Sequence, residues 1–196
     1  MHPHRKLFIQ MSGAPGSGKS TLANLLAQAI DGVAINHDLI RSFFLDNDNT
    51  FEQSAKLTYR FQWVLAEDMI KQGRSVIIDS TCNFKEILDE GTALARKYGY
   101  DYKYIECRVD DIDLLEERLK TRVSMRSQRP GGDVPPRDAS ITRDSEDSRA
   151  LFKRWIESPC RPTRDAMTVD STSSPEKCLD SILRQISMLE DKMGDL

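Results

Sequence analysis

The stretch from Gly13 to Thr21 constrains this chain more than any other part of its sequence. It reads Gly-Ala-Pro-Gly-Ser-Gly-Lys-Ser-Thr and matches G-x-x-x-x-G-K-[ST], the pattern of a phosphate-binding loop. An apolar run at 7–11 precedes the loop, and apolar residues at helical spacing follow it from Leu22 to Ile30. This order of strand, loop and helix is the context that the pattern requires. The chain is therefore expected to bind the phosphates of a nucleoside triphosphate.

Every residue of the loop is a candidate cofactor ligand: Gly13, Ala14, Pro15, Gly16, Ser17, Gly18, Lys19, Ser20 and Thr21. The glycines allow backbone N–H groups to approach phosphate oxygens, and the start of the next helix adds about half a positive charge. Lys19 is expected to contact the β- and γ-phosphates of ATP and to act in catalysis. The Ser20 hydroxyl group is expected to ligate Mg²⁺.

Length and composition predict one soluble globular domain that spans residues 1–196. The chain is 39% hydrophobic and 30% charged, with a net charge of −3. No apolar run is long enough to cross a bilayer, and the first residues lack the apolar segment of a secretory signal. The four cysteines are widely spaced, so we expect reduced thiols and a cytoplasmic protein. The negative net charge disfavours a dedicated nucleic-acid binder.

Strand and helix signals alternate along the chain, which is typical of a parallel sheet with helices on both faces. Strands are expected at 7–11, 33–36, 75–79, 102–109 and 166–170. After a helix expected at 112–122, residues 126–137 are rich in Pro, Gly and Arg and lack apolar periodicity. A helix is expected to resume near Ser145. The prediction is an α/β fold, a three-layer P-loop NTPase sandwich with a five-stranded parallel sheet and a lid insertion at about 123–145.

A carboxylate, Asp38, follows the second expected strand in the sequence Asn36–Arg41. Because ligands gather at the carboxyl ends of parallel strands, Asp38 should face the phosphate-binding loop. There it would accept a proton from an attacking hydroxyl group, and Arg41 would bind an anionic group of the acceptor. Spacing alone fits equally well with Asp38 as the N-cap of the next helix and Arg41 on a solvated face.

A second carboxylate, Asp79, ends the apolar run at 76–78. A carboxylate at the end of a buried strand beside a phosphate-binding loop commonly serves the magnesium ion, often through water. The alternative is a residue that caps the following turn. Ser80 and Thr81 come next and are candidates to contact the substrate or a phosphate oxygen.

Four arginines lead into the Pro- and Gly-rich segment: Arg118, Arg122, Arg126 and Arg129. The first three would share one helix face if the helix continued through them. Guanidinium groups on a closing lid stabilise the charge that spreads over a transferred phosphate. Arg122 and Arg126 are therefore candidate nucleotide ligands, and Arg122 is a candidate catalytic residue. The alternative is an ordinary solvated face.

These motifs together resemble the polynucleotide-kinase/zeta-toxin/gluconate-kinase-like group of P-loop phosphotransferases, which are ATP-binding proteins of the AAA_33 type. The similarity rests on the phosphate-binding loop, on Asn36–Arg41 and on Val76–Thr81. The stretch between Arg122 and Ser158 is longer than in compact members, and we expect no partner phosphatase or ligase domain. Both departures leave the acceptor open.

The resemblance implies roles for individual residues. By it, Asp38 is the general base, Arg41 and Thr81 bind the acceptor, and Arg122 contacts the transferred phosphate. The segment after the last expected strand, with Ser171 and Thr172, resembles the one that lies against the adenine ring of ATP.

The resulting expectation is a kinase that uses ATP and Mg²⁺ to phosphorylate a hydroxyl group of a small-molecule acceptor. One alternative is a polynucleotide 5′-hydroxyl kinase that would use the basic region 118–137. Its pI of about 5.7 and the lack of a basic stripe with interleaved aromatic residues oppose that alternative. Another is a nucleotide-dependent switch or ATPase, which would need a water-positioning residue in place of Asp38. The sequence specifies neither the acceptor nor an oligomeric state.

Overall fold

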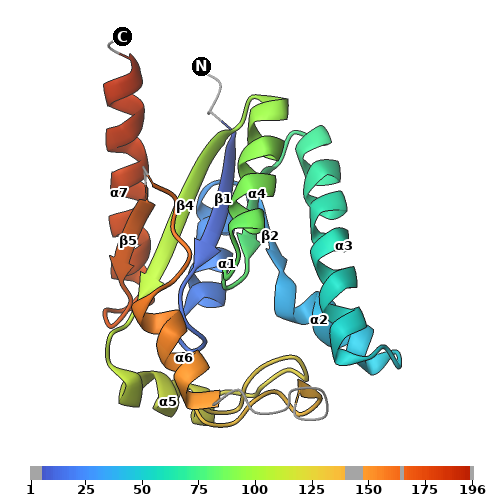
Figure 1. The fold of residues 1–196 in the computed structure, drawn as a ribbon. Coiled ribbons are helices and arrows are strands. Elements are labelled where there is room, and N and C mark those ends of the chain that lie inside the picture. The colour runs from blue at the N-terminus through green and yellow to red at the C-terminus, as the bar shows by residue number, and fades with distance from the viewer. Residues whose placement is uncertain (1–5, 140–147, 164–165, 195–196) are drawn as a thin grey trace.

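The computed structural model describes residues 6–139, 148–163 and 166–194, and a single parallel sheet forms its centre (Figure 1). The strands are β1 (Leu7–Ser12), β2 (Gly32–Asn36), β3 (Ser75–Asp79), β4 (Asp101–Arg108) and β5 (Ala166–Asp170). They lie in the order β2-β3-β1-β4-β5, and each pair of neighbours is parallel. The strand that leads into the phosphate-binding loop, β1, is therefore in the middle of the sheet.

Helices follow the strands along the chain. They are α1 (Lys19–Ala29), α2 (His37–Asp46), α3 (Phe51–Lys71), α4 (Lys85–Tyr98), α5 (Ile112–Thr121), α6 (Ser148–Glu157) and α7 (Pro175–Gly194). Within the described part of the chain, no helix combines the length and apolarity that a membrane crossing requires.

Two apolar cores lie on the two faces of the sheet, and β1 contributes to both. Its odd-numbered residues pack against α1 and α7: Leu7, Ile9 and Met11. Phe8 points to the other face, where its ring stacks on Trp63 of α3 at a centroid distance of 6.4 Å. Burial on both faces explains why β1 begins with three successive apolar residues, Leu7–Ile9, and not with an alternation of apolar and polar ones. The predicted α/β architecture, with a five-stranded parallel sheet between helical layers, is confirmed.

The carboxyl ends of the strands face α5, α6 and the loop between them, whereas the two chain ends lie at the opposite end of the sheet (Figure 1). The loop residues 122–138 form turns and bends without a helix or strand. An apolar cluster that includes Leu115, Leu119 and Phe152 holds α5 and α6 together beneath the phosphate-binding loop. The expected helix start near Ser145 and the end of the predicted lid, residues 140–145, lie outside the described residues.

Helix α5 ends one residue earlier than expected, at Thr121. The apolar face of the helix is no longer buried beyond this point. Leu115 and Leu119 are buried, but Val123, the next residue of that face, is 99% exposed. Arg122 already has extended backbone angles, with φ −78° and ψ 152°. The expectation that Arg118, Arg122 and Arg126 share one helix face is therefore wrong.

Candidate active site

Glycine residues set the path of the phosphate-binding loop between β1 and α1. Gly13, Gly16 and Gly18 have φ angles of +130°, +89° and +86°, a region that L side chains rarely adopt. Space is also restricted: a Cβ atom on Gly13 would lie 2.3 Å from the Cys107 carbonyl oxygen, and one on Gly16 would lie 2.9 Å from that of Leu115. Close approach of the backbone to a phosphate requires such a loop.

The loop residues expected to bind the nucleotide divide into two groups. Those that line a cavity are Pro15, Gly16, Gly18, Lys19, Ser20 and Thr21. Gly13, Ala14 and Ser17 are buried behind them. The Ser17 N–H donates to the Ala14 carbonyl at 3.1 Å, and the buried Ser17 hydroxyl has no hydrogen-bond partner among the described residues. The buried group shapes the loop, and the lining group forms the surface of the loop that faces the cavity.

Lys19 lies at the start of α1 with its ammonium group inside the protein. Its side chain donates a 3.0 Å hydrogen bond from Nζ to the carbonyl oxygen of Ala14. Burial lowers the pKa of Lys19, and the nearby carboxylates of Asp79 and Asp38 act in the opposite direction. The positive charge is thus held next to the loop by acidic neighbours.

Asp79 ends β3 and is 5% exposed. Burial raises its pKa, while the nearby Ser20 hydroxyl group and the charge of Lys19 oppose that rise. Two oxygen-bearing side chains, Ser20 and Asp79, therefore lie close together where they line a cavity beside the phosphate-binding loop. Oxygen donors of this kind fit Mg²⁺, which keeps several waters and takes its remaining ligands from phosphates. The described residues contain no group of three or more His, Cys, Asp or Glu side chains placed to hold a metal ion by themselves.

Asn36, and not Asp38, caps helix α2. The Asn36 side-chain oxygen accepts a 3.0 Å hydrogen bond from the Leu39 N–H, and Asn36 has the extended backbone of an N-cap residue. Asp38 lies inside the first turn, where a negative charge is favourable, and it lines the cavity. The alternative in which Asp38 serves as the N-cap is therefore wrong.

Two residues of the loop after α5 hold the Asp38 carboxylate. Ser127 Oγ lies 3.1 Å from Asp38 Oδ1 and 3.0 Å from the Asp38 carbonyl oxygen. The Gln128 amide donates to Oδ2 at 3.0 Å. Neither residue is predicted from the sequence, because nothing in the local pattern indicates that they contact a residue 89 or 90 positions earlier in the chain.

The wall of the cavity next to Asp38 combines one arginine with aromatic rings. Arg41 donates from Nη2 to the Phe51 carbonyl at 3.2 Å, and its guanidinium group lies 3.9 Å from the centroid of the Phe51 ring. Tyr59 and Phe84 also line this wall, in an edge-to-face pair with centroids 6.4 Å apart. Arg41 is thus partly buried against α3 and faces the cavity, in contrast to the alternative of a solvated position.

Other predicted or neighbouring residues complete that wall. Thr81 lines the cavity as expected, and its carbonyl oxygen accepts a hydrogen bond from Ser12 Oγ at 3.3 Å. His37 is a packed ring: its Nδ1 lies 2.9 Å from Gln62 Oε1, and burial lowers the pKa of His37. A neutral, hydrogen-bonded histidine of this kind supports the wall and needs no catalytic role.

Three of the four arginines line the cavity: Arg118, Arg122 and Arg129. Arg122 donates from Nη2 to the Arg129 carbonyl at 2.9 Å. Burial lowers the pKa of Arg122, and the nearby charge of Asp38 counteracts this effect. Arg129 is 5% exposed and lies 5.4 Å from the ring centroid of Trp155 on α6.

Arg126 differs from the expectation that it binds the nucleotide. It is not among the residues that line the cavity. Its guanidinium group forms two hydrogen bonds to Asp138, at 2.9 and 3.0 Å, and a third to the Leu45 carbonyl oxygen at 2.7 Å. Because these contacts hold Arg126 on the outer side of the loop, it braces the loop against α2.

The segment after β5 contacts the phosphate-binding loop through Ser171. Ser171 Oγ donates to the Ser17 carbonyl at 2.6 Å, and the Ser171 carbonyl accepts from Arg118 at 3.0 Å. Thr172 does not join this arrangement: its hydroxyl donates to Asp170 at 2.7 Å, and it is absent from the cavity lining, which includes Ser173 instead. Of the two residues expected beside the nucleotide, Ser171 lines the cavity and Thr172 does not.

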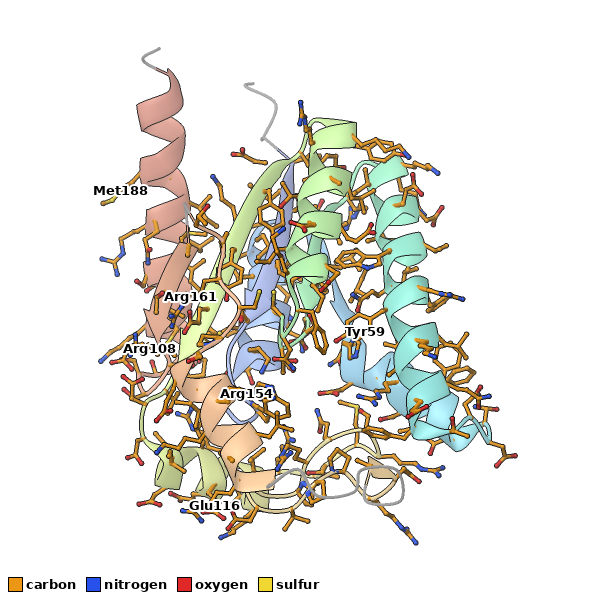
Figure 2. The ribbon with its side chains drawn as sticks, viewed as in Figure 1. Tyr59, Arg108, Glu116, Arg154, Arg161 and Met188 are labelled. Carbon is orange, nitrogen blue, oxygen red and sulfur yellow. The ribbon has the colours of Figure 1, made fainter. Side chains whose placement is uncertain are left out.

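One cavity of about 1060 Å³ brings these groups together at the carboxyl end of the sheet. Figure 2 shows two of its lining residues, Tyr59 of α3 and Arg154 of α6, on opposite sides. Pockets for one small ligand usually measure about 300–1,000 Å³. The cavity is therefore as large as the upper end of that range.

Comparison with known proteins supports this assignment of the fold. An adenylyl-sulfate kinase from Bacillus velezensis is 26% identical over 125 residues, which are 59% of this chain and 59% of that protein. A gluconokinase structure from Sinorhizobium meliloti has a TM-score of 0.62 at 15% identity and covers 97% of each chain. A structure of APS kinase from Mycobacterium tuberculosis in complex with AMPPNP and APS has a TM-score of 0.58 at 19% identity, over 94% of this chain and 99% of that one.

The two structural similarities show the fold alone because their identities are low. The chain spans only 59% of the length of the curated relative that it matches. A broader match comes from a family model, AAA_33, described as an AAA domain, which covers residues 8–135. This range contains the phosphate-binding loop, Asp38, Asp79 and most of the loop after α5. The chain belongs to the AAA_33 family.

Proposed function

We propose that this protein is a kinase that transfers the γ-phosphate of ATP to a hydroxyl group of a small-molecule acceptor. The observation that carries the proposal is the position of Asp38. Its carboxylate and the phosphate-binding loop line the same cavity, so a hydroxyl group bound at Asp38 would face a phosphate bound at the loop. A switch or ATPase would not need a second cavity wall with its own carboxylate and arginine.

The nucleotide half of the site would bind ATP through the loop backbone and Lys19. Ser20 and Asp79, which both line the cavity, would hold Mg²⁺. When bound, the ion neutralises charge on the phosphate oxygens. Residues 122–139 would serve as the lid. Its Arg122 and Arg129, which line the cavity, would contact the transferred phosphate.

The acceptor half of the site would perform the proton transfer. The acceptor hydroxyl would donate its proton to Asp38 as its oxygen forms a bond to the γ-phosphorus, and the bond from that phosphorus to the leaving oxygen of ADP would break. Arg41 and Thr81 would bind polar groups of the acceptor. The rings of Phe51, Tyr59 and Phe84 support an acceptor that also carries an apolar or flat part.

The similar proteins suggest where a search for the acceptor should start. One is named an adenylyl-sulfate kinase and another a gluconokinase, so nucleotide-like compounds and sugar acids belong in the first panel. An oligonucleotide with a 5′-hydroxyl end tests the alternative polynucleotide kinase.

We also propose a cytoplasmic setting for the protein. The cysteines of the described chain are free thiols, which supports this proposal.

The test is ADP release, measured with ATP and Mg²⁺ in the presence of each panel compound. We expect one class of hydroxyl compound to raise ADP release well above the rate with water alone, and a phosphorylated product to appear by mass spectrometry. ADP release that no compound accelerates would identify an ATPase or a switch and would refute the proposal.

A further inference from the structure

The loop that covers the cavity also holds the carboxylate at the acceptor end. Ser127 and Gln128 contact both oxygens of the Asp38 side chain, at 3.1 and 3.0 Å. Among the described residues Asp38 forms no ion pair, and the direct partners of its carboxylate are a hydroxyl group and an amide. Neutral donors orient a carboxylate without neutralising its charge, which is what a proton acceptor requires.

The orientation of the Gln128 amide is fixed by a second contact. Its side-chain oxygen accepts a 3.1 Å hydrogen bond from the Met125 N–H. Because one end of the amide is thereby the acceptor, the NH₂ end must be the group that faces Asp38. The loop therefore presents a donor to the carboxylate and not a second acceptor.

Ser127 is fixed even more firmly. It is 4% exposed, and its backbone N–H donates to Ser42 Oγ of α2 at 3.0 Å. The Ser42 hydroxyl also lies 3.0 Å from Ser127 Oγ. Ser42 and Asp38 are one helical turn apart on α2. Ser127 contacts both residues, and its hydroxyl group is directed at Asp38.

The contacts leave room for a substrate. A carboxylate has about four sites that accept hydrogen bonds, and each Asp38 oxygen has one partner from the loop. An acceptor hydroxyl can therefore bind without displacing Ser127 or Gln128. The two residues orient the carboxylate and do not block it.

We infer that Ser127 and Gln128 are positioning residues for Asp38, so that docking of the loop on α2 and orientation of the proposed base are a single event. This inference rests on the proposed function. It assigns the loop a task on the acceptor side of the cavity, in addition to the cationic residues that it places toward the phosphates. A misplacement of about 1 Å at a reacting group can cost about 100-fold in rate.

The first experiment tests the contact without using activity. Gln128→Glu keeps an oxygen for the Met125 N–H but sets two carboxylates against each other, and it should raise hydrogen exchange across 125–128 by about 10- to 100-fold, the scale of a lost hydrogen bond to a charged group. Asp38→Asn should have a smaller effect, because its amide oxygen can still accept from the Gln128 NH₂ group while its own NH₂ group faces the Ser127 hydroxyl group. In the double variant the amide introduced at position 38 can turn its NH₂ group toward the new carboxylate, and exchange should return toward the wild-type rate. An equal increase from Gln128→Glu in the wild-type and Asp38→Asn backgrounds would overturn the inference.

The second experiment tests the consequence for transfer. With the acceptor identified from the panel, Ser127→Ala and Gln128→Glu should lower kcat by about 10- to 100-fold and change the KM for ATP by less than about twofold. A purely structural role would instead lower stability and weaken ATP binding along with kcat.

A matched control removes a lid contact that does not involve α2. Asp133 forms an exposed ion pair with Arg149 at 3.0 Å, with side chains 51% and 62% exposed, so Asp133→Asn should leave both readouts near wild type. If wild-type protein transfers phosphate and Ser127→Ala and Gln128→Glu match its kcat, the inference alone is wrong. Failure of the proposed function is seen separately, as wild-type protein that transfers phosphate to no acceptor.

Discussion

The ammonium group of Lys19 is bound to the backbone of its own phosphate-binding loop, through a 3.0 Å hydrogen bond from Nζ to the Ala14 carbonyl oxygen. The same carbonyl accepts from the Ser17 N–H at 3.1 Å. The loop therefore stays closed on itself through Ser17 even when Lys19 leaves to contact a phosphate. A substitution of Lys19 is therefore expected to affect the proposed catalysis more than the stability of the fold.

Lys19→Met should therefore abolish turnover without unfolding the protein. We expect ADP release to fall by about 100- to 1,000-fold, the cost of removing one donor from a developing negative charge. The melting temperature without ligand should be unchanged or higher, because burial of the ammonium group disfavours its charged form. Thermal melts with and without ATP, beside the turnover assay, measure both effects. Wild-type turnover in this variant would exclude Lys19 from the site.

Asp38→Asn should separate binding from transfer. Asn36 caps α2, so the change leaves the helix start intact, and ATP affinity measured by calorimetry should stay near wild type. Transfer to the acceptor should fall by about 100- to 10,000-fold, the reach of a positioned base. A large loss of ATP affinity in a folded variant would instead place Asp38 among the phosphate or metal ligands.

Gly16→Ala should damage the loop through its backbone. Gly16 has a φ angle of +89°, and an added Cβ would lie 2.9 Å from the Leu115 carbonyl oxygen. Such substitutions cost more than about 1 kcal/mol, and here the strain falls on the phosphate-binding surface. Gly131→Ala is the matched control, because its nearest neighbour would be Val134 Cγ2 at 3.7 Å and its φ is not in the strained region. Equal ATP affinity in the two variants would show that the loop tolerates a side chain.

Glu67→Gln should make the free energy of unfolding depend less on pH in acidic solution. Hydrogen bonds from Lys97 and Tyr98, at 2.7 and 2.6 Å, lower the pKa of Glu67 from 4.5 to about 2. Because the folded-state pKa is below the unfolded value, this stabilisation is complete above pH 4.5 and is lost as pH falls toward about 2. Urea midpoints on both sides of this window should differ less in the variant than in wild type, and salt should reduce the difference. Equal pH slopes in the two proteins would contradict the assignment.

Nucleotide should protect the lid. Residues 122–138 of the lid form no helix or strand. Their backbone amides therefore exchange readily unless other contacts protect them. A non-hydrolysable ATP analogue that contacts Arg122 and Arg129 should slow exchange in this loop and leave the β4 core unchanged. Equal exchange in both states would remove the loop from the nucleotide site.

The sequence was sufficient for the parts of the molecule that local patterns determine. The alternation of apolar strands and amphipathic helices predicts the parallel sheet, and the loop motif places Lys19 and Ser20. Asp79 could be placed beside them because it ends a buried strand, and parallel strands end on the same side of a sheet.

Contacts between distant segments could not be predicted in this way. The end of α5 depends on whether Val123 finds a partner, and its 99% exposure is a tertiary result that helical spacing does not contain. The same holds for Arg126, whose charge pattern fits a phosphate ligand but whose partners are Asp138 and Leu45. Ser127 and Gln128 carry no motif at all, and only the folded chain reveals what they touch.

The hydrogen bond from Ser171 Oγ to the Ser17 carbonyl has a consequence for how the protein is made. It joins residues 154 positions apart. The phosphate-binding loop is therefore synthesised early, but the residue that supports it is synthesised late. During synthesis, a nascent chain that has not yet extruded β5 and Ser171 would have the motif without its support. We expect nucleotide to protect ribosome-bound chains from protease only after this segment has left the exit tunnel.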